Sequence, residues 1–113
     1  MTHEMRLDPT PFAAIAEGRK TLELRLFDEK RQAITEGDTI LFCERGSGRR
    51  LTARVVALHR FQGFAELYAA LPLSKCGYRE CELATASPAD MEKYYSLAEQ
   101  EKYGVVAIEI SLI

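Results

Sequence analysis

One short segment, from Thr21 to Leu26, alternates strictly between apolar and polar side chains. Its leucines occupy every second position, and the residues between them are threonine, glutamate and arginine. A period of two is typical of a β-strand that places one face against a core. A helical pattern from Pro9 to Glu17 precedes it and ends at Gly18, a residue type that commonly closes helices in the left-handed conformation. The chain is therefore expected to pass from a short helix directly into a strand whose second face is charged.

The remaining hydrophobic patterns predict three more strands and two more helices. Alternating or β-branched runs indicate strands, and apolar residues three or four positions apart indicate amphipathic helices. Strands are expected at 39–43, 51–58 and 105–112, helices at 64–71 and from 88 to about 102, and irregular loops at 28–36 and 73–86. Because strands and helices do not alternate regularly, a doubly wound parallel sheet is not expected. The order favours a small α+β fold, with four or five strands in a curved or barrel-like sheet and three peripheral helices.

Chain length and charge limit the possible functions. A chain of 113 residues suits one domain, expected to cover 1–113, and can build a core without a stabilising metal or disulfide. Charged residues make up 28% of the chain and the formal net charge is −2, which excludes a broadly cationic nucleic-acid-binding surface. Any binding of phosphate must therefore come from a local basic patch.

The cysteines and histidines argue against a metal site. Three cysteines, an odd number, and the lack of a secretory leader favour a reducing, cytoplasmic compartment. Cys76 and Cys81 have no matching pair at zinc-ligand spacing, and the two histidines lie far apart in the sequence. No apolar run reaches the length of a membrane span. We therefore expect no metal, no cofactor and no membrane partner.

One segment of the chain does concentrate basic residues. Between Arg45 and Gly63 there is no aspartate or glutamate, whereas the last third of the chain is acidic on balance. Such asymmetry can create a positive stripe on a protein of negative total charge. It is also typical of a charged hairpin that keeps a sheet edge soluble. If the segment binds nucleic acid, the residues expected to guide the phosphate backbone are Arg49, Arg50 and Arg54.

The charged face of the strand at 21–26 also has two interpretations. Glu23 and Arg25 lie opposite the leucines, and Lys20 stands at the junction with the preceding helix. On an open sheet these side chains would lie in solvent and form weak cross-strand pairs. On a closed barrel they would instead line a cleft between the sheet and a loop. Spacing alone favours the solvated face.

Two short motifs give the sequence a family likeness. They are G-x-K-x-x-E-x-R, at Gly18–Arg25, and G-D-x-I, at Gly37–Ile40. Together they resemble the signature of the ASCH domain, a member of the PUA-like superfamily of small β-barrels with flanking helices. The likeness extends over most of the chain, from the leading helix to the final strand. It implies a small PUA-like β-barrel of about five mixed strands with three peripheral helices.

The resemblance also implies a ligand. The family is thought to bind RNA or nucleotides in a cleft beside the motif strand. Lys20 and Arg25 would then contact phosphate or a base edge, while Glu23 would accept a hydrogen bond from a base amino group or orient Lys20. Lysine acts as a point charge and arginine as a planar fork, which suits phosphate and base edges respectively. The expected partner is therefore RNA, a nucleotide or a nucleoside.

One branch of the family is similar to acylcytidine amidohydrolases and implies an alternative function. That branch uses the motif lysine, a threonine three residues later and a downstream glutamate. Lys20 matches the lysine, but Glu23 stands at the threonine position, where a carboxylate would keep the amine charged and weaken it as a base. Glu80 and Glu82 are the candidates for the downstream glutamate, and also fit solvated loop acids; Glu82 is favoured because it lies nearer the following helix. An enzyme would then use Lys20, Glu23 and Glu82 as catalytic residues.

Other chemically notable side chains have simpler explanations. Tyr78 lies in an expected loop and is the best candidate for stacking on a base. Tyr94 and Tyr95 fall at helical positions and are expected in the core. Cys76 follows Lys75, which favours a thiolate, but no histidine lies nearby in the sequence to complete a nucleophile pair.

Three functions stay open on the sequence alone. The preferred one is an RNA- or nucleotide-binding module, and the second is a small amidohydrolase that acts on N4-acylated cytidine or a related nucleoside. The third is a protein-interaction or regulatory domain without catalysis, in which the charged strand is inert. An exposed Lys20 and Glu23 on a flat surface would favour this third function, and so would a cleft filled by phenylalanine, leucine or tyrosine.

Overall fold

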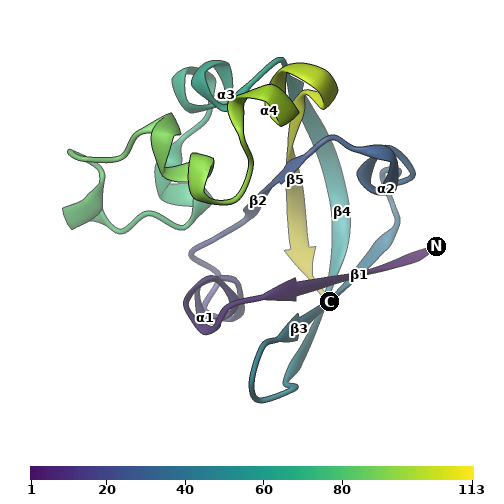
Figure 1. The fold of residues 1–113 in the computed structure, drawn as a ribbon. Coiled ribbons are helices and arrows are strands. Elements are labelled where there is room, and N and C mark those ends of the chain that lie inside the picture. The colour runs from purple at the N-terminus through teal and green to yellow at the C-terminus, as the bar shows by residue number, and fades with distance from the viewer.

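The computed structural model describes all 113 residues, and its centre is one five-stranded mixed sheet. The strands are β1 (Thr2–Leu7), β2 (Leu22–Leu26), β3 (Thr39–Glu44), β4 (Arg50–Phe61) and β5 (Val105–Leu112). Their order in the sheet is β1-β3-β4-β5-β2, with β1 parallel to β3 and the other neighbours antiparallel. The sheet curves into a half-barrel (Figure 1). Its two edge strands, β1 and β2, do not pair with each other.

Helices and short helical turns surround this sheet. The α-helices are α1 (Pro9–Ala16), α2 (Glu29–Gln32), α3 (Phe64–Ala70) and α4 (Leu97–Tyr103), and 3₁₀ turns occur at Leu73–Cys76, Glu80–Glu82 and Pro88–Lys93. In Figure 1 the green segment between α3 and α4 extends to one side of β2, whereas α2 lies on the other. The α+β class and the five mixed strands are thus confirmed, and the three expected helices match this set only roughly.

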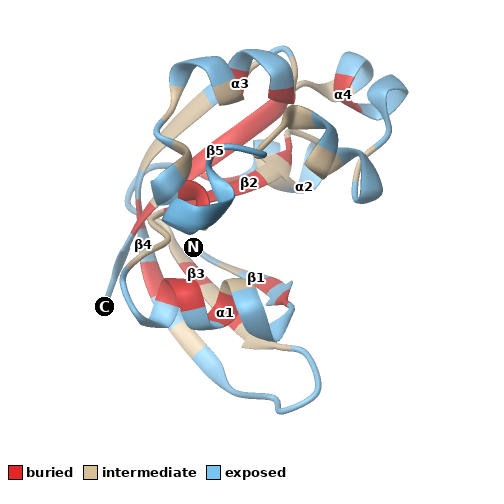
Figure 2. Cartoon of the chain, turned by 90° about the vertical axis from the view of Figure 1, so that its left-hand side faces the viewer, coloured by how far each residue is buried: buried red, intermediate tan, exposed pale blue.

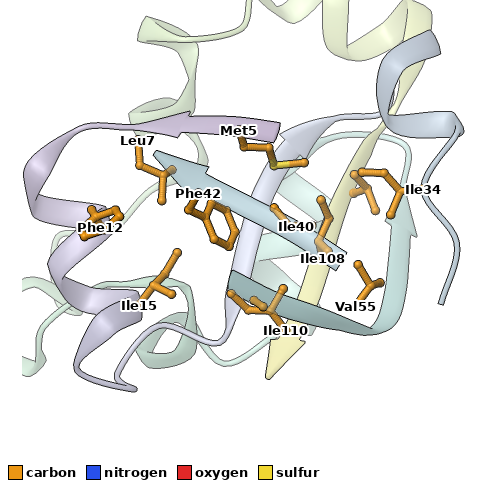
Figure 3. Close-up of a cluster of buried hydrophobic side chains, with 12 residues drawn as sticks. Met5, Leu7, Phe12, Ile15, Ile34, Ile40, Phe42, Val55, Ile108 and Ile110 are labelled. Carbon is orange, nitrogen blue, oxygen red and sulfur yellow. The ribbon is translucent and has the colours of Figure 1, made fainter. Parts of the chain in front are cut away.

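The larger core fills the interior of the half-barrel. Apolar side chains converge on it from β1, α1, β3, β4 and β5, as the labelled residues in Figure 3 show. Each large apolar side chain that is fully buried stabilises the fold by about 1.5–3 kcal/mol. The twelve members of this barrel core are Met5, Leu7, Phe12, Ile15, Ile34, Ile40, Phe42, Ala53, Val55, Val106, Ile108 and Ile110.

A second core lies between the sheet and α3. The strand β5 contributes to both cores, because alternate residues point to opposite faces of a sheet. It is therefore buried along most of its length, which Figure 2 shows in red. The second core consists of Leu22, Leu24, Leu26, Phe64, Leu67, Cys76, Val105 and Ala107.

The strand β1 is the element that the sequence patterns do not predict. Only Met5 and Leu7 of this segment are buried, so its alternation is too short to indicate a strand. Its position comes from parallel pairing with β3 and from a contact near its start, where His3 Nε2 lies 2.8 Å from Asp38 Oδ2. The His3 contact and the Thr35 backbone N–H lower the pKa of Asp38 to about 2. The Gly-Asp motif thus anchors the edge strand that completes the half-barrel.

Two other segments differ from the expected loops and helices. The polar segment before β3, expected to be a loop, contains the single-turn helix α2, which Asp28 caps. The helix expected at 88–102 is two separate elements, because Ser96 starts a new helix. Its hydroxyl accepts from the Glu99 N–H, and the Glu99 carboxylate accepts from the Ser96 N–H, which is a capping box. The other predicted helices and strands are confirmed, with small differences at their ends.

Candidate functional site

The motif strand β2 is covered on both of its faces. Its three leucines pack into the second core beneath α3. Glu23 and Arg25 therefore point to the opposite face, toward the inner side of the half-barrel, and Lys20 lies just before the strand. Glu23 is only 3% exposed. The solvated face that spacing alone favours is therefore wrong, because the curvature of the sheet and the segment after α3 enclose this side of the strand.

Glu23 joins Lys20 and Arg25 in a buried ion triad. Lys20 Nζ lies 2.7 Å from Glu23 Oε1, and Arg25 Nε donates to Glu23 Oε2 at 2.7 Å. The side chains are 11%, 4% and 13% exposed, for Lys20, Glu23 and Arg25 in that order. Burial alone would raise the pKa of Glu23, but the two cations outweigh it and lower the pKa below the usual 4.5. Burial alone would lower the pKa of Arg25, but Glu23 and the Tyr95 hydroxyl outweigh it and raise the pKa.

Arg25 also spans the seam between the two edge strands. Its Nη2 donates to the backbone carbonyl of Arg6 in β1, at 3.1 Å. The strand β1 ends at Leu7, where the chain turns into α1, so no strand lies beside the Lys20 end of β2. The Lys20 end of β2 therefore faces α1 instead of a strand, and residues of both line the same cleft.

A cleft of about 630 Å³ lies beside this part of β2. This volume falls within the range of about 300–1,000 Å³ that is typical of small-molecule sites. One wall comes from the end of β1 and from α1, the triad forms part of the lining on β2, and the facing wall comes from the segment 76–95. Four tyrosines and four carboxylates line the cleft, together with five basic residues: Arg6, Lys20, Arg25, Arg45 and Lys93.

A hydrogen-bonded tyrosine pair organises the facing wall. The Tyr78 hydroxyl donates to Asp90 Oδ2 at 2.7 Å and lies 2.7 Å from the Tyr68 hydroxyl. Burial raises the pKa of Tyr78, and the hydrogen bond to Asp90 raises it further, so this phenol stays protonated. Next to it, Gly77 has φ +105°, and a Cβ there would lie 3.2 Å from Cδ of Lys20. The glycine therefore lets the wall pack closely against the Lys20 stem.

The sequence matches the family described as ASCH domain over residues 5–113. The chain belongs to the ASCH domain family. The crystal structure of the hypothetical protein PH0355 is similar to it, with 32% identity, a TM-score of 0.83 and 100% of both chains covered. The solution NMR structure of protein PF0455 from Pyrococcus furiosus has 33% identity and a TM-score of 0.68, and the match covers 100% of this chain and 98% of that one.

The ASCH domain fold also extends to a more distant structure. The crystal structure of ASCH from Zymomonas mobilis has 16% identity and a TM-score of 0.69, and the match covers 97% of this chain and 66% of that one. At this identity the likeness shows the fold alone. A search of curated proteins finds no match.

The cleft of this ASCH domain contains some of the predicted site residues and leaves others outside. The motif triad, Tyr78 and Glu82 all line it, whereas Glu80 does not. The Glu82 carboxylate also has a structural role, because it accepts from the Arg79 N–H at 2.8 Å and caps the 3₁₀ turn that follows. The structure thus places Glu82, but not Glu80, in the cleft lining, and any role of Glu82 toward a ligand stays a prediction.

The predicted basic stripe lies outside the cleft of the ASCH domain. Arg49, Arg50 and Arg54 are exposed, and none of them lines the cleft. The Arg49 guanidinium lies 5.4 Å from the ring centroid of Phe12 in α1, so it stands beside a helix that forms a cleft wall. Arg54 alternates with buried neighbours in β4 and therefore points away from the barrel core. Of the three, Arg49 is the one that contacts α1, a helix that contributes to one wall of the cleft.

Several lining residues of the ASCH domain were not predicted from the sequence as site residues. Arg6 lies on the unpredicted strand β1, and Arg45 follows β3 at the start of the basic segment. Lys93 and Tyr94 line the cleft because the expected long helix is interrupted. Tyr94 is 57% exposed, so its expected place in the core is wrong, whereas Tyr95 is half-buried against the second core. The capping signal at residue 96 is the sequence feature that indicates this interruption.

Cys76 is a buried thiol at the edge of the cleft. Burial raises its pKa to about 11, so the thiolate that the neighbouring Lys75 was expected to favour is not formed near neutral pH. The ASCH domain contains no group of three or more histidine, cysteine, aspartate or glutamate side chains that could hold a metal ion. None of its helices is long and apolar enough to span a membrane.

Proposed function

We propose that this ASCH domain is a binding module for single-stranded RNA or a nucleotide, which it holds in the cleft beside β2. The observation that carries the proposal is the buried triad in the lining of that cleft. Removing three charged groups from water has a large desolvation cost, and well-packed apolar residues are often as stabilising. A triad of this kind beside a cleft is therefore better explained by a ligand than by stability of the fold.

The triad keeps hydrogen-bond donors that a ligand can use. Lys20 carries three N–H donors and is paired through one contact with Glu23. Arg25 carries five N–H donors, of which Nε and Nη2 are engaged by Glu23 and by the Arg6 carbonyl. Glu23 thus fixes both cations in place, and their remaining donors suit the oxygen and nitrogen acceptors of a nucleotide.

The carboxylates of the cleft are already engaged, which reduces their repulsion of an anionic ligand. Glu23 is neutralised within the triad, and Asp90 accepts from the Tyr78 hydroxyl. Asp8 accepts from Arg45 Nη1 at 3.1 Å on the exposed rim. A strand that leaves the cleft past Arg45 would next meet Arg49 beside α1, which provides a short basic path for phosphates.

Binding of a short fluorescent single-stranded RNA at low salt tests this proposal. We expect Lys20→Ala combined with Arg25→Ala to weaken binding by at least roughly tenfold, because both cations of the triad are lost. Affinity for the wild-type domain should also fall as salt rises. Glu17→Gln combined with Arg19→Gln removes a surface ion pair at the end of α1 and is the matched control.

A second variant keeps the test valid if the buried double variant unfolds. Arg6→Ala combined with Lys93→Ala removes two exposed cations of the cleft rim and leaves the triad intact. We expect weaker RNA binding with an unchanged melting temperature. No detectable binding by the wild-type domain at low salt would exclude the cleft as an RNA or nucleotide site. So would wild-type affinity in both the Lys20/Arg25 and the Arg6/Lys93 double variants.

An amidohydrolase is the second candidate, because Lys20 and Glu82 both line a cleft of nucleoside size. Against it, Lys20 Nζ lies 2.7 Å from a carboxylate that stabilises its charged form and weakens it as a base. Release of acetate from N4-acetylcytidine by the folded domain, abolished by Glu82→Gln, would support hydrolysis. No turnover above buffer would remove this candidate. The regulatory alternative loses one of its two supporting features, since Lys20 and Glu23 are not exposed.

A further inference from the structure

The strand β2 presents one free edge to the cleft. Its ladder partner is β5, and in the sheet order no strand follows it on the other side. The Thr21 carbonyl accepts from the N–H of Ile110, and the Phe27 N–H donates to the carbonyl of Gly104, so odd-numbered residues turn their peptide groups toward β5. The even-numbered residues therefore turn theirs toward the seam: Leu22, Leu24 and Leu26.

Leu24 is the member of this group that lines the cleft. Its side chain belongs to the second core, and its N–H and C=O lie on the edge of β2 that faces away from β5. The residue is only 7% exposed, and no strand pairs with this edge of β2, so the sheet ladder supplies no partner for its N–H and C=O. Buried peptide groups almost always have hydrogen-bond partners, which here must come from water or a ligand.

We propose that the Leu24 peptide edge pairs with the edge of a nucleobase. The Leu24 N–H donates to a ring nitrogen or carbonyl of the base, and the Leu24 C=O accepts from the adjacent ring N–H or amino group. This inference rests on the proposed function and deepens it, because it assigns the base, not the phosphate, to the inner cleft. The base must be unpaired to offer this edge, which fits single-stranded RNA or a free nucleotide.

The charges of the cleft support this division of the ligand. Glu23 already compensates the two inner cations, so the lining beside Leu24 is close to neutral and suits an uncharged ring. A phosphate monoester carries about −1.5 to −2 charge and needs uncompensated cations. Arg6 and Lys93 are exposed on the rim and take part in no ion pair, so they suit the phosphate.

Matched ligands test the pairing without changing the protein. Uridine monophosphate and 3-methyluridine monophosphate differ by one methyl group, which replaces the ring N–H that would donate to the Leu24 carbonyl. We expect the methylated nucleotide to bind at least roughly tenfold more weakly in calorimetry, because a buried acceptor loses its partner. Ribose 5-phosphate reports the phosphate contribution alone and is expected to bind more weakly than uridine monophosphate.

Replacing the Leu24 amide by an ester tests the protein side of the same pair. A synthetic segment 1–42 that carries the ester can be ligated to 43–113 at the native Cys43. The ester removes the Leu24 N–H, which is outside the β2–β5 ladder, and weakens the Glu23 carbonyl as an acceptor within it, so circular dichroism is used to check that each ester variant is folded. An ester at Leu26, on the same edge but outside the cleft lining, is the control. We expect the Leu24 ester to weaken binding of uridine monophosphate roughly tenfold and the Leu26 ester to leave it unchanged.

The outcomes separate this inference from the proposed function. Weaker binding of the methylated nucleotide, together with weaker binding by the Leu24 ester, supports base pairing to the main chain. The inference is overturned if the wild-type domain binds both nucleotides equally and both ester variants bind uridine monophosphate as tightly as the wild type. Nucleotide binding in the cleft would still stand. If the wild-type domain binds none of the nucleotides and no RNA, the proposed function fails and the inference fails with it.

Discussion

Two neighbouring sets of charged residues have nearly the same contact distances and very different surroundings. Arg19 Nε lies 2.8 Å from Glu17 Oε2 at the end of α1, and the contacts of the triad measure 2.7 Å. The Glu17 side chain is 53% exposed, however, whereas that of Glu23 is 4% exposed. Exposed pairs are screened by water and contribute little to stability, while a buried charge depends on its partners. Burial, not distance, therefore separates the structural surface pair from the candidate site.

The largest predicted effect comes from removing the central carboxylate of the triad. Glu23→Gln leaves Lys20 and Arg25 buried beside each other without a compensating charge. We expect the free energy of unfolding to fall by about 3–5 kcal/mol, the usual cost of breaking a buried ion pair. Urea denaturation followed by circular dichroism measures this change.

The control for this prediction is the surface pair. Glu17→Gln removes a carboxylate with similar contact geometry, and we expect no measurable change in unfolding. If the two substitutions destabilise the domain equally, the triad is not an energetically distinct unit. The difference in burial between Glu23 and Glu17 would then no longer mark the triad as a candidate site.

The pH dependence of stability follows from the same carboxylate. Because the folded-state pKa of Glu23 lies below the usual 4.5, its stabilising contribution is complete above that value. It is lost as the pH falls below 4.5 and through the lowered folded-state pKa. The stability difference between the wild-type domain and Glu23→Gln should therefore be largest near neutral pH and shrink in acid. Urea titrations at about pH 7 and about pH 3.5 measure it; a constant difference would show that the carboxylate is not ionised in the folded state.

Two glycines sharpen the comparison at the cleft wall. Gly46 has φ +93° with nothing near the position of a Cβ, whereas Gly77 has φ +105° and Lys20 Cδ at 3.2 Å. We expect Gly46→Ala to destabilise the domain by about 1–2 kcal/mol through backbone strain alone. Gly77→Ala adds displacement of the Lys20 stem, which we expect to cost about 1 kcal/mol more and to weaken RNA binding. Equal unfolding energies and equal RNA affinity would show that the wall does not position Lys20.

The regular parts of this fold could be predicted because their signals are local. The alternation from Thr21 to Leu26 indicates β2, and the helical spacing that ends at Gly18 indicates α1. β1 could not be found in this way, since only Met5 and Leu7 are buried and the strand depends on pairing with the distant β3. Predictability thus falls where a segment is held by long-range contacts more than by its own pattern.

The candidate site shows the same division. The motif spacing places Lys20, Glu23 and Arg25 close together on one strand, but it does not show that the strand is covered on both faces. That burial comes from β1, α1 and the segment 76–95, which are brought to β2 only by the curvature of the sheet. The unpaired edge of β2 depends on the order of the strands in the sheet, which no pattern in the sequence of β2 records.

The smallest predicted effect concerns two exposed arginines, one just before β4 and one within it. Arg49 stands beside α1 near the cleft, and Arg54 points from β4 away from the barrel core. Both are solvent-exposed, so neither substitution to alanine should change the unfolding free energy by more than about 0.5 kcal/mol. If RNA leaves the cleft past α1, Arg49→Ala should reduce the slope of log affinity against log salt by about 0.7, the loss of one phosphate contact on a single strand, and Arg54→Ala should leave it unchanged. An equal reduction for both would mean that RNA crosses the outer face of the sheet, and the basic segment would then be a binding surface independent of the cleft.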